Sequence, residues 1–450
     1  MTKQGSLGIV VVVAAVGLTV ACDLTLRAGK VGNKTNAPGP DGSCPTGLVV
    51  CGTGAFARCV DLQADHEHCG SCATVCLPGI ACAAGACQQI ACTGPVTVST
   101  QIPAETTAPT DPPIDGAIFA DVNGDGHPDL VTWQATDLES LAWGTFRVAL
   151  GEAGGGFGAA STYQTASQVS YIFAADWNAD GFDDLYVTDG EDSNCLVLWM
   201  GHADGSLSVA ADIGDAGCLI PMVAADLNGD GNMDLVAYHP LGPSPPTVFL
   251  ADAHGAFHVG TPLSNHEDLS RLVVRDWNGD GSPDLVAVEG TLSVYLNKGN
   301  GAFGDEIDCG VYASGQVVVA DFNRDGHLDV ATSPTDDDVG ILLGMGGCQF
   351  QPMTNYRFSD YVLNVVYADV DGDGIGDLLA SSATPDGSIF LMRGAGNGTF
   401  QVDLLFSGAA TLLGSCPLLV GDVTGDARVD VVSCRAGNNA SIQIQENTCP

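Results

Sequence analysis

Residues 121–129 read Asp-Val-Asn-Gly-Asp-Gly-His-Pro-Asp, and the pattern Asp-x-Asn-x-Asp-Gly-x-x-Asp returns along the chain. The smallest interval between copies is 45 residues, from 276 to 321, and the largest is 55, from 121 to 176. A motif at such a period marks a repeat architecture in which each copy belongs to one structural unit. The seven copies begin at Asp121, Asp176, Asp226, Asp276, Asp321, Asp369 and Asp422.

Each copy of the motif lies between short apolar runs with high strand propensity. In the fifth copy, residues 317–320 precede the motif and residues 328–331 follow it, which predicts an antiparallel hairpin with the motif in its turn. A third run covers residues 339–343, and a fourth begins at Phe350. Four strands in each unit of about 50 residues, repeated around an axis, are typical of a β-propeller. The chain is therefore predicted to be all-β from about residue 95 onward.

The motif carries oxygen ligands at positions 1, 3, 5 and 9, and the carbonyl group of position 7 offers another. Alternate residues turn inward around a sharp bend at a glycine, here Gly126, as in the first half of a calcium-binding loop. Carboxylates without imidazole or thiolate favour a hard cation, and Mg²⁺ suits them less because it requires a stricter octahedron. The predicted calcium ligands of the first six copies are Asp121, Asn123, Asp125, His127 and Asp129; Asp176, Asn178, Asp180, Phe182 and Asp184; Asp226, Asn228, Asp230, Asn232 and Asp234; Asp276, Asn278, Asp280, Ser282 and Asp284; Asp321, Asn323, Asp325, His327 and Asp329; and Asp369, Asp371, Asp373, Ile375 and Asp377.

The seventh copy departs from the pattern. Ala427 stands where the other copies have Gly, and Thr424 stands where most have Asn, so the turn is strained and one ligand is weaker. Its ligands would be Asp422, Thr424, Asp426 and Asp430, and we expect them to bind Ca²⁺ weakly or not at all. The sequence predicts about six or seven Ca²⁺ sites with a structural role, the last site being the weakest.

A glycine-rich turn near a Phe accompanies the motif, at residues 154–158, 255–257, 300–304 and 397–400. Together the two features resemble the FG-GAP, or VCBS, repeat of integrin α-subunit heads and many bacterial surface proteins. The resemblance covers about residues 95–450. It implies an all-β fold, a seven-bladed β-propeller of four-stranded blades with calcium-binding hairpin loops.

The seventh unit ends after its third predicted strand. A β-rich stretch within residues 95–102, ahead of the first unit, could supply the missing strand and remove the open sheet edges. Cys92 and Cys449 flank these two strands, so we predict a disulfide between them across the seam. Two further disulfides are predicted, one between Cys416 and Cys434 and the other between Cys195 and Cys218. No pairing is predicted for Cys309 and Cys348.

A cysteine-rich module is predicted at residues 44–92, where disulfides replace a hydrophobic core. If Cys92 pairs outward, eight cysteines remain for four bridges whose connectivity the sequence does not decide. The stretch at residues 68–72, with the cysteines that follow it, is similar to the stigma-specific cysteine-rich family. An alternative is a zinc site, with the candidate ligands His66, His68, Cys69 and Cys72.

The N-terminus has the pattern of an export signal. Residues 1–21 contain a long uncharged apolar run that ends in Ala21, directly before Cys22. This layout resembles the bacterial lipobox, which implies acylation of Cys22, although Thr19 stands where Leu is usual; the alternative is an ordinary signal peptide. Residues 22–43 are predicted to be a flexible tether. We expect an exported bacterial protein, either an outer-surface or periplasmic lipoprotein or a secreted one.

The charge of the chain limits its partners. Fourteen Lys and Arg against 54 Asp and Glu give a formal net charge of -40, which repels nucleic acid and anionic lipid. We therefore expect no nucleic-acid partner, and contact with a membrane only through the N-terminal lipid anchor. The propeller is expected to be monomeric.

No nucleophile elbow, zinc-protease motif or phosphate loop occurs in the sequence, so no catalytic residue is predicted. The nearest approach to a catalytic cluster is His254, His258, Arg271 and Arg275. Trp177 and Trp277 occupy motif position 2, which is apolar in every copy, and they are therefore expected to pack in the core.

These features predict a non-enzymatic, calcium-stabilised propeller at the cell surface or secreted, which binds a protein or glycan partner. The alternative is a secreted carbohydrate-active enzyme, a polysaccharide lyase or a hydrolase, on the same scaffold. A deep central pocket with a His or Tyr beside an Arg would favour the enzyme. A flat acidic face with apolar rim loops would favour the binding protein.

Overall fold

The structure is a computed structural model, and it describes five short strands between residues 49 and 101 together with most of residues 116–448. The gaps after residue 116 are 135–143, 154, 166–168, 170, 179, 189–195, 211–218, 239–244, 253–255, 264–268, 270, 289, 334–336, 359–360, 383–387, 408–417, 427 and 436–440.

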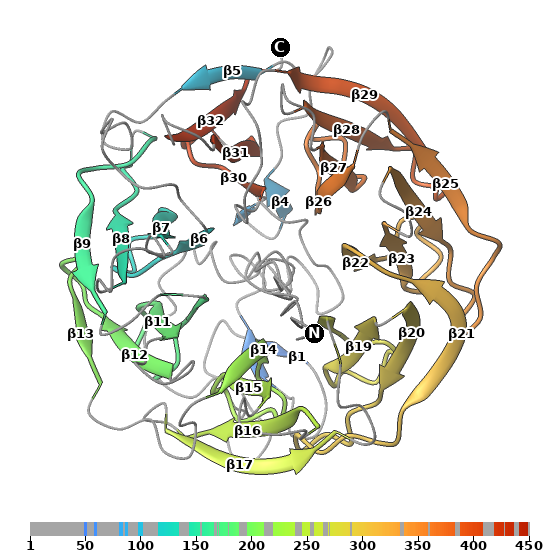
Figure 1. The fold of residues 1–450 in the computed structure, drawn as a ribbon, viewed down its shortest axis with the longest axis horizontal. Coiled ribbons are helices and arrows are strands. Elements are labelled where there is room, and N and C mark those ends of the chain that lie inside the picture. Colours follow the sequence, from blue (N-terminus) through green and yellow to red (C-terminus); the bar gives the residue numbers. More distant parts are fainter. Residues whose placement is uncertain are drawn as a thin grey trace, which may run out of the picture.

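Seven four-stranded antiparallel sheets are arranged as blades around a central axis (Figure 1). The predicted seven-bladed all-β propeller is confirmed. In chain order the blades are β6 (Gly116–Ala120), β7 (Asp129–Gln134), β8 (Thr145–Ala149) and β9 (Ser161–Gln164); β10 (Ile172–Ala175), β11 (Asp184–Thr188), β12 (Leu196–Gly201) and β13 (Leu207–Val209); β14 (Ile220–Ala225), β15 (Asp234–Tyr238), β16 (Thr247–Ala251) and β17 (Phe257–Pro262); β18 (Arg271–Arg275), β19 (Asp284–Val288), β20 (Gly290–Tyr295) and β21 (Ile307–Ala313); β22 (Val317–Ala320), β23 (Asp329–Thr332), β24 (Asp338–Leu342) and β25 (Thr354–Arg357); β26 (Val362–Ala368), β27 (Asp377–Ser382), β28 (Ser388–Gly394) and β29 (Phe400–Ser407); and β30 (Leu419–Gly421), β31 (Asp430–Arg435), β32 (Ser441–Asn447) and β5 (Val98–Gln101).

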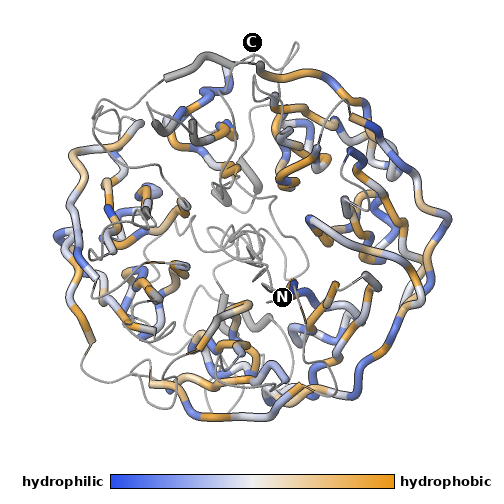
Figure 2. Tube along the Cα trace, viewed as in Figure 1, coloured by the Kyte–Doolittle hydropathy of each residue, from blue (hydrophilic) through white to orange (hydrophobic). Residues whose placement is uncertain are grey.

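The first strand of each blade is innermost and the fourth is outermost (Figure 1). Every residue of β6 and β22 is buried, as expected for strands covered on both faces, which read as continuous apolar runs. The outer strands β9 and β25 are largely exposed. In Figure 2 the outer ring alternates between hydrophilic and hydrophobic residues. In these two blades the innermost strand is thus buried and the outermost strand largely faces solvent.

The ring is closed by a strand from the other end of the repeat region. β5 pairs antiparallel with β32, with Gln101 opposite Ile444 and Val98 opposite Asn447. It lies within the stretch 95–102 that the sequence offered for this place. The innermost strand of the seventh blade, β30, also contacts β6 of the first blade. The two ends of the propeller are thus joined both at the rim and at the centre.

The hydrophobic cores lie between blades rather than inside single sheets. One core combines Val131 and Phe146 of the first blade with Ile172 and Leu185 of the second. The next core contains Trp177, fully buried, whose ring lies 4.5 Å from that of Tyr186 between centroids. Packing between neighbours is what couples the repeats into one fold.

Motif position 2 packs beneath its loop, as predicted. Its side chain is buried in six copies, while Trp277 is half-buried against Phe350. The six buried residues are Val122, Trp177, Leu227, Phe322, Val370 and Val423.

Two short hairpins precede the propeller. β1 (Val49–Cys51) pairs with β2 (Arg58–Val60), and β3 (Ala81–Ala83) pairs with β4 (Ala86–Gln88), which places Cys82 opposite Cys87 in the backbone register. The export signal 1–21, Cys22, the tether 22–43 and the alternative zinc ligands lie outside the described residues. Among the described residues, no helix has the length and hydropathy to cross a membrane.

Cys309 and Cys348, to which the sequence gave no partner, form a disulfide with a Cα–Cα distance of 4.8 Å. It joins the fourth blade to the fifth. The three predicted disulfides cannot be placed, because Cys92, Cys195, Cys218, Cys416, Cys449 and the side chain of Cys434 lie outside the described residues.

Candidate metal centre

All seven Asp-rich loops lie at the same end of the blades. Each one connects the innermost strand of its blade to the second strand, as the loop of residues 121–128 connects β6 to β7. Because the first strands share one direction around the axis, their loops emerge on one face of the propeller, which we call the loop face. Repetition thus gathers the acidic side chains of distant sequence positions on one surface.

The aspartate at position 9 begins the second strand and is completely buried in every copy. In the first copy, Asp129 Oδ2 accepts the backbone N–H of Val122 at 2.9 Å, and Oδ1 accepts that of Gly151 at 2.8 Å. The first donor belongs to the loop itself, and the second lies near the end of the third strand. This carboxylate therefore ties the loop to the third strand of its own blade.

The same pair of hydrogen bonds recurs in all seven blades. The Oδ1 donors lie at, or within two residues of, the end of the third strand, with N–O distances of 2.7 to 2.9 Å. In chain order they are Gly151, Gly201, Ala251, Asn297, Gly344, Gly394 and Asn447. Position 9 was predicted only as a metal ligand, and any coordination would use lone pairs that these N–H groups leave open.

Burial disfavours the charged form of these carboxylates. Desolvation raises the pKa of Asp129, Asp184, Asp234 and Asp377 to about 7, although backbone hydrogen bonds act in the opposite direction. Nearby aspartates of the same loop raise the pKa further, as Asp121 and Asp125 do for Asp129. A cation held in the loop would oppose both effects, because it favours ionised carboxylates.

Positions 1, 3 and 5 fold the loop around themselves. Asp121 Oδ1 and Oδ2 accept the N–H groups of Asp125 and Gly126, both at 3.0 Å. Asn123 Oδ1 also accepts the N–H of Asp125, and Asp125 Oδ1 accepts that of His127. Gly126 has a φ of 84°, a conformation that glycine adopts without steric cost. The same turn recurs with positive φ at the glycines Gly181, Gly231, Gly281, Gly326 and Gly374.

The first five loops share one further contact, in which the Asn at position 3 donates its Nδ2 to Oδ2 of the Asp at position 5. The N–O distances are 2.8 to 3.0 Å. A bound cation would compete with this amide for the same carboxylate oxygen. The donor set of oxygens only, with no imidazole or thiolate among the side chains at positions 1, 3, 5 and 9, fits a hard cation such as Ca²⁺.

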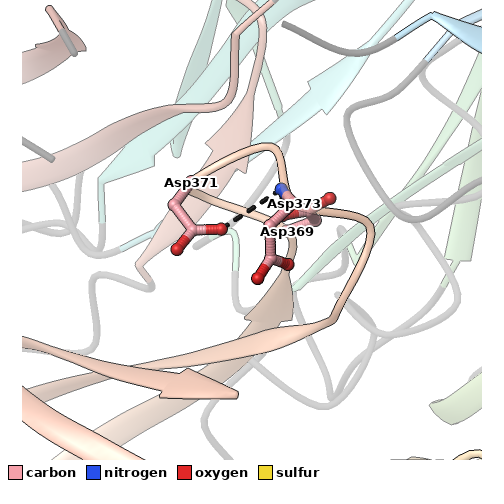
Figure 3. Close-up of side chains that lie close together, drawn as sticks. All are labelled: Asp369, Asp371 and Asp373. Atoms are coloured by element: carbon pink, nitrogen blue, oxygen red, sulfur yellow. Dashed lines mark hydrogen bonds between the residues drawn. The ribbon is translucent and has the colours of Figure 1, made fainter. Parts of the chain in front are cut away.

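The sixth loop has Asp371 at position 3 and therefore brings three carboxylates together. One oxygen each from Asp369, Asp371 and Asp373 lies within 4.8 Å of the others, so the group could hold a metal ion (Figure 3). Asp369 and Asp371 are buried and Asp373 is exposed. Arg393 Nη1 lies 3.2 Å from Asp371 Oδ2 and offsets part of this negative charge.

The His and Arg residues considered for catalysis do not form one cluster among the described residues. His258 lies on the outermost strand of the third blade and faces Asp252 at 3.6 Å, whereas Arg271 and Arg275 are at opposite ends of the innermost strand of the fourth blade. Arg271 Nη1 lies 3.4 Å from Gln316 Oε1, and Arg275 Nε donates to the carbonyl of Val319. His254 is outside the described residues.

The family model of the FG-GAP-like repeat matches residues 121–187, 176–237, 276–332, 321–380 and 369–433. These ranges include more than half of the chain, and the chain belongs to this family. A comparison with curated proteins gives no significant match.

Several solved structures have a similar fold. The BP39L lectin from Burkholderia pseudomallei superposes with a TM-score of 0.53 and 13% identity, over 75% of this chain and 98% of that chain. An Agrocybe aegerita lectin that recognises non-reducing terminal N-acetylglucosamine has a TM-score of 0.50 and 17% identity, over 73% and 86%. An exotype rhamnogalacturonan lyase has a TM-score of 0.45 and 12% identity, over 82% and 80%. At these identities the similarity to the two lectins shows the propeller fold alone.

Proposed function

We propose that this protein is a calcium-stabilised β-propeller, exported to the cell surface or secreted, which binds a glycan or protein partner and catalyses no reaction. The observation that carries the proposal is the sevenfold arrangement on the loop face. There a motif of oxygen donors is fixed to its blade by the aspartate at position 9. Such repetition is typical of a scaffold element, whereas a catalytic site needs one unique group of residues.

Calcium in this scheme is structural. The ions would be held by the oxygen atoms at positions 1, 3, 5, 7 and 9 of the first six loops. If calcium stands about tenfold above its Kd, each site adds about 1.4 kcal/mol to the free energy of unfolding, which is about 8 kcal/mol for six sites. This equals the whole stability of many domains, so the propeller would depend on calcium for its fold.

The disulfide between Cys309 and Cys348 supports export. Disulfides persist in oxidising compartments and are rare in the bacterial cytosol. The proposed route is the signal at residues 1–21, with a lipid on Cys22 as the only membrane anchor. The chain would then meet its partner in the periplasm, at the outer surface or in the medium.

A glycan is the first partner to test, because two of the similar structures, with TM-scores of 0.50 and 0.53, are of lectins. The mature full chain, with calcium, would be applied to a glycan array, and binding to any selected glycan would then be measured by calorimetry. We expect binding without chemical change of the glycan. Release of shortened or unsaturated sugars from a polysaccharide would overturn the proposal in favour of a hydrolase or a lyase. Failure of every glycan to bind would move the test to protein partners.

A further inference from the structure

The seventh loop differs from the other six in the charge at position 7. Arg428 occupies this position, where the other copies have neutral or weakly basic residues. Its Nη1 donates to Asp426 Oδ2 at 2.7 Å, and its backbone N–H donates to Asp426 Oδ1 at 3.0 Å. The side chains of Arg428 and Asp426 are only 25% and 28% exposed. Both oxygens of the carboxylate at position 5 are thus engaged by one residue of the same loop.

The side chain at position 3 of this loop is also engaged, because it forms a hydrogen bond with the aspartate at position 9. Thr424 Oγ1 donates to Asp430 Oδ2 at 3.0 Å, and the backbone N–H of Thr424 donates to the same oxygen. In the first five loops, the side chain at position 3 instead donates to position 5. In the seventh loop the side chain of Arg428 donates to Asp426 at position 5, and the side chain of Thr424 donates to Asp430 at position 9.

We infer that Arg428 is a built-in cation of the seventh loop: its guanidinium group provides the positive charge that calcium provides in the other loops, and this loop binds no calcium. The inference rests on the proposed calcium role for its comparison with the other loops. It goes beyond that role because it assigns the seventh loop a different, metal-independent means of neutralising its carboxylates. A guanidinium group suits this place because it stays charged at any physiological pH and binds a carboxylate through directed N–H groups.

The sixth loop shows that an arginine near the motif is not sufficient to neutralise the carboxylates of a loop. Arg393 comes from the third strand β28 and not from the loop, and it is shared between Asp371 at 3.2 Å and Asp403 at 3.7 Å. Within the described part of the chain, neither Asp369 nor Asp373 forms an ion pair with an arginine. That loop keeps carboxylates for a metal, whereas Arg428 acts from the motif itself.

The seventh loop lies where the seventh blade meets the first blade. The backbone N–H of Gly156 in the first blade donates to the carbonyl of Val423 at 2.8 Å, and Gly155 lies directly against the backbone of Thr424. The seventh blade, to which this loop belongs, also receives the closing strand β5. The loop therefore supports the seam where the two ends of the propeller meet. A loop with its own cation keeps this seam in place when calcium is low.

The test compares Arg428→Ser with the wild-type mature chain. Serine is the residue at the same position of the fourth loop, Ser282. A second variant, Arg428→Ser with Ala427→Gly, also restores the glycine that the other loops have at position 6. The control is Arg357→Ser, because Arg357 is 77% exposed, pairs with Asp337 at 2.9 Å and lies on the outer strand β25. The measurements are the melting temperature with chelator and with calcium, and the number of calcium ions bound per chain.

We expect Arg428→Ser to lower the melting temperature in chelator by about 2 °C more than the control does. The double variant should bind about one ion more than wild type, and calcium should therefore restore its stability. Equal melting temperatures for Arg428→Ser and Arg357→Ser in chelator, or an unchanged ion count in the double variant, would overturn the inference. So would a wild-type ion count that falls when Asp426 is changed to Asn.

The ion count also separates this inference from the calcium proposal. If the wild-type chain binds no calcium, the proposed calcium role fails. A lower melting temperature of Arg428→Ser in chelator would then still support the part of the inference that concerns the ion pair.

Discussion

Cys309 on β21, the outermost strand of the fourth blade, is disulfide-bonded to Cys348 in the turn between β24 and β25 of the fifth blade. The bond closes a loop of sequence separation 39. Because it joins two different blades, it restrains the sliding of one sheet past its neighbour and reduces the freedom of the unfolded chain.

The double variant Cys309→Ser, Cys348→Ser should be less stable than wild type. The chain-entropy relation gives about 4 kcal/mol for a loop of this length. Denaturant unfolding of the oxidised proteins measures the difference. Equal midpoints for wild type and the double variant would show that the bridge does not stabilise the fold.

The disulfide also illustrates which contacts could not be predicted from the sequence. The calcium motif, the strands around it and the seven blades follow from patterns within about ten to fifty residues, which are visible in a single chain. Cys309 and Cys348 become neighbours only when the rim of one blade meets the next blade. For the same reason Gly151 could not be predicted as a partner of Asp129, because it reaches this carboxylate through the third strand. Arg428 did leave a signal, a cation at motif position 7.

Two aspartates of the third loop should respond to mutation in different ways. Asp234 at position 9 is buried and accepts the N–H groups of Leu227 and Ala251, so Asp234→Asn places an amide against one of these donors. We expect a loss of about 1 to 3 kcal/mol in the free energy of unfolding, with calcium and with chelator alike. Asp230 at position 5 is exposed, and Asp230→Asn should lower stability chiefly when calcium is present.

The comparison needs an aspartate outside the loops. Asp204 caps the exposed turn between β12 and β13 through Ser206, and Asp204→Asn serves as this control. Thermal unfolding of the wild type and the three variants, each with calcium and with chelator, gives the required eight values. A loss for Asp234→Asn that disappears in chelator would contradict the structural role of position 9.

Removal of calcium should destabilise the whole propeller. With about six ions bound, we expect the mature chain to melt at a much lower temperature in excess chelator, by the equivalent of about 8 kcal/mol at tenfold saturation. Magnesium should restore little of this loss, because it gives up its water ligands reluctantly. Calorimetry together with a count of bound ions measures both quantities. A melting temperature that chelator leaves unchanged would remove calcium from the proposal.

The seam between the first and seventh blades can be tested with two neighbouring glycines. Gly155 and Gly156 have φ values of 84° and 85°, so alanine is strained at either position by a similar amount. A Cβ atom at Gly155 would collide with the backbone of Thr424, whereas at Gly156 it would meet nothing within 4 Å. Gly155→Ala should therefore cost about 1 to 3 kcal/mol more than Gly156→Ala, because it overpacks the contact with the seventh loop. Denaturant unfolding of both variants in calcium measures the difference. Equal losses in the free energy of unfolding would mean that Gly155 of the first blade is not closely packed against the seventh loop.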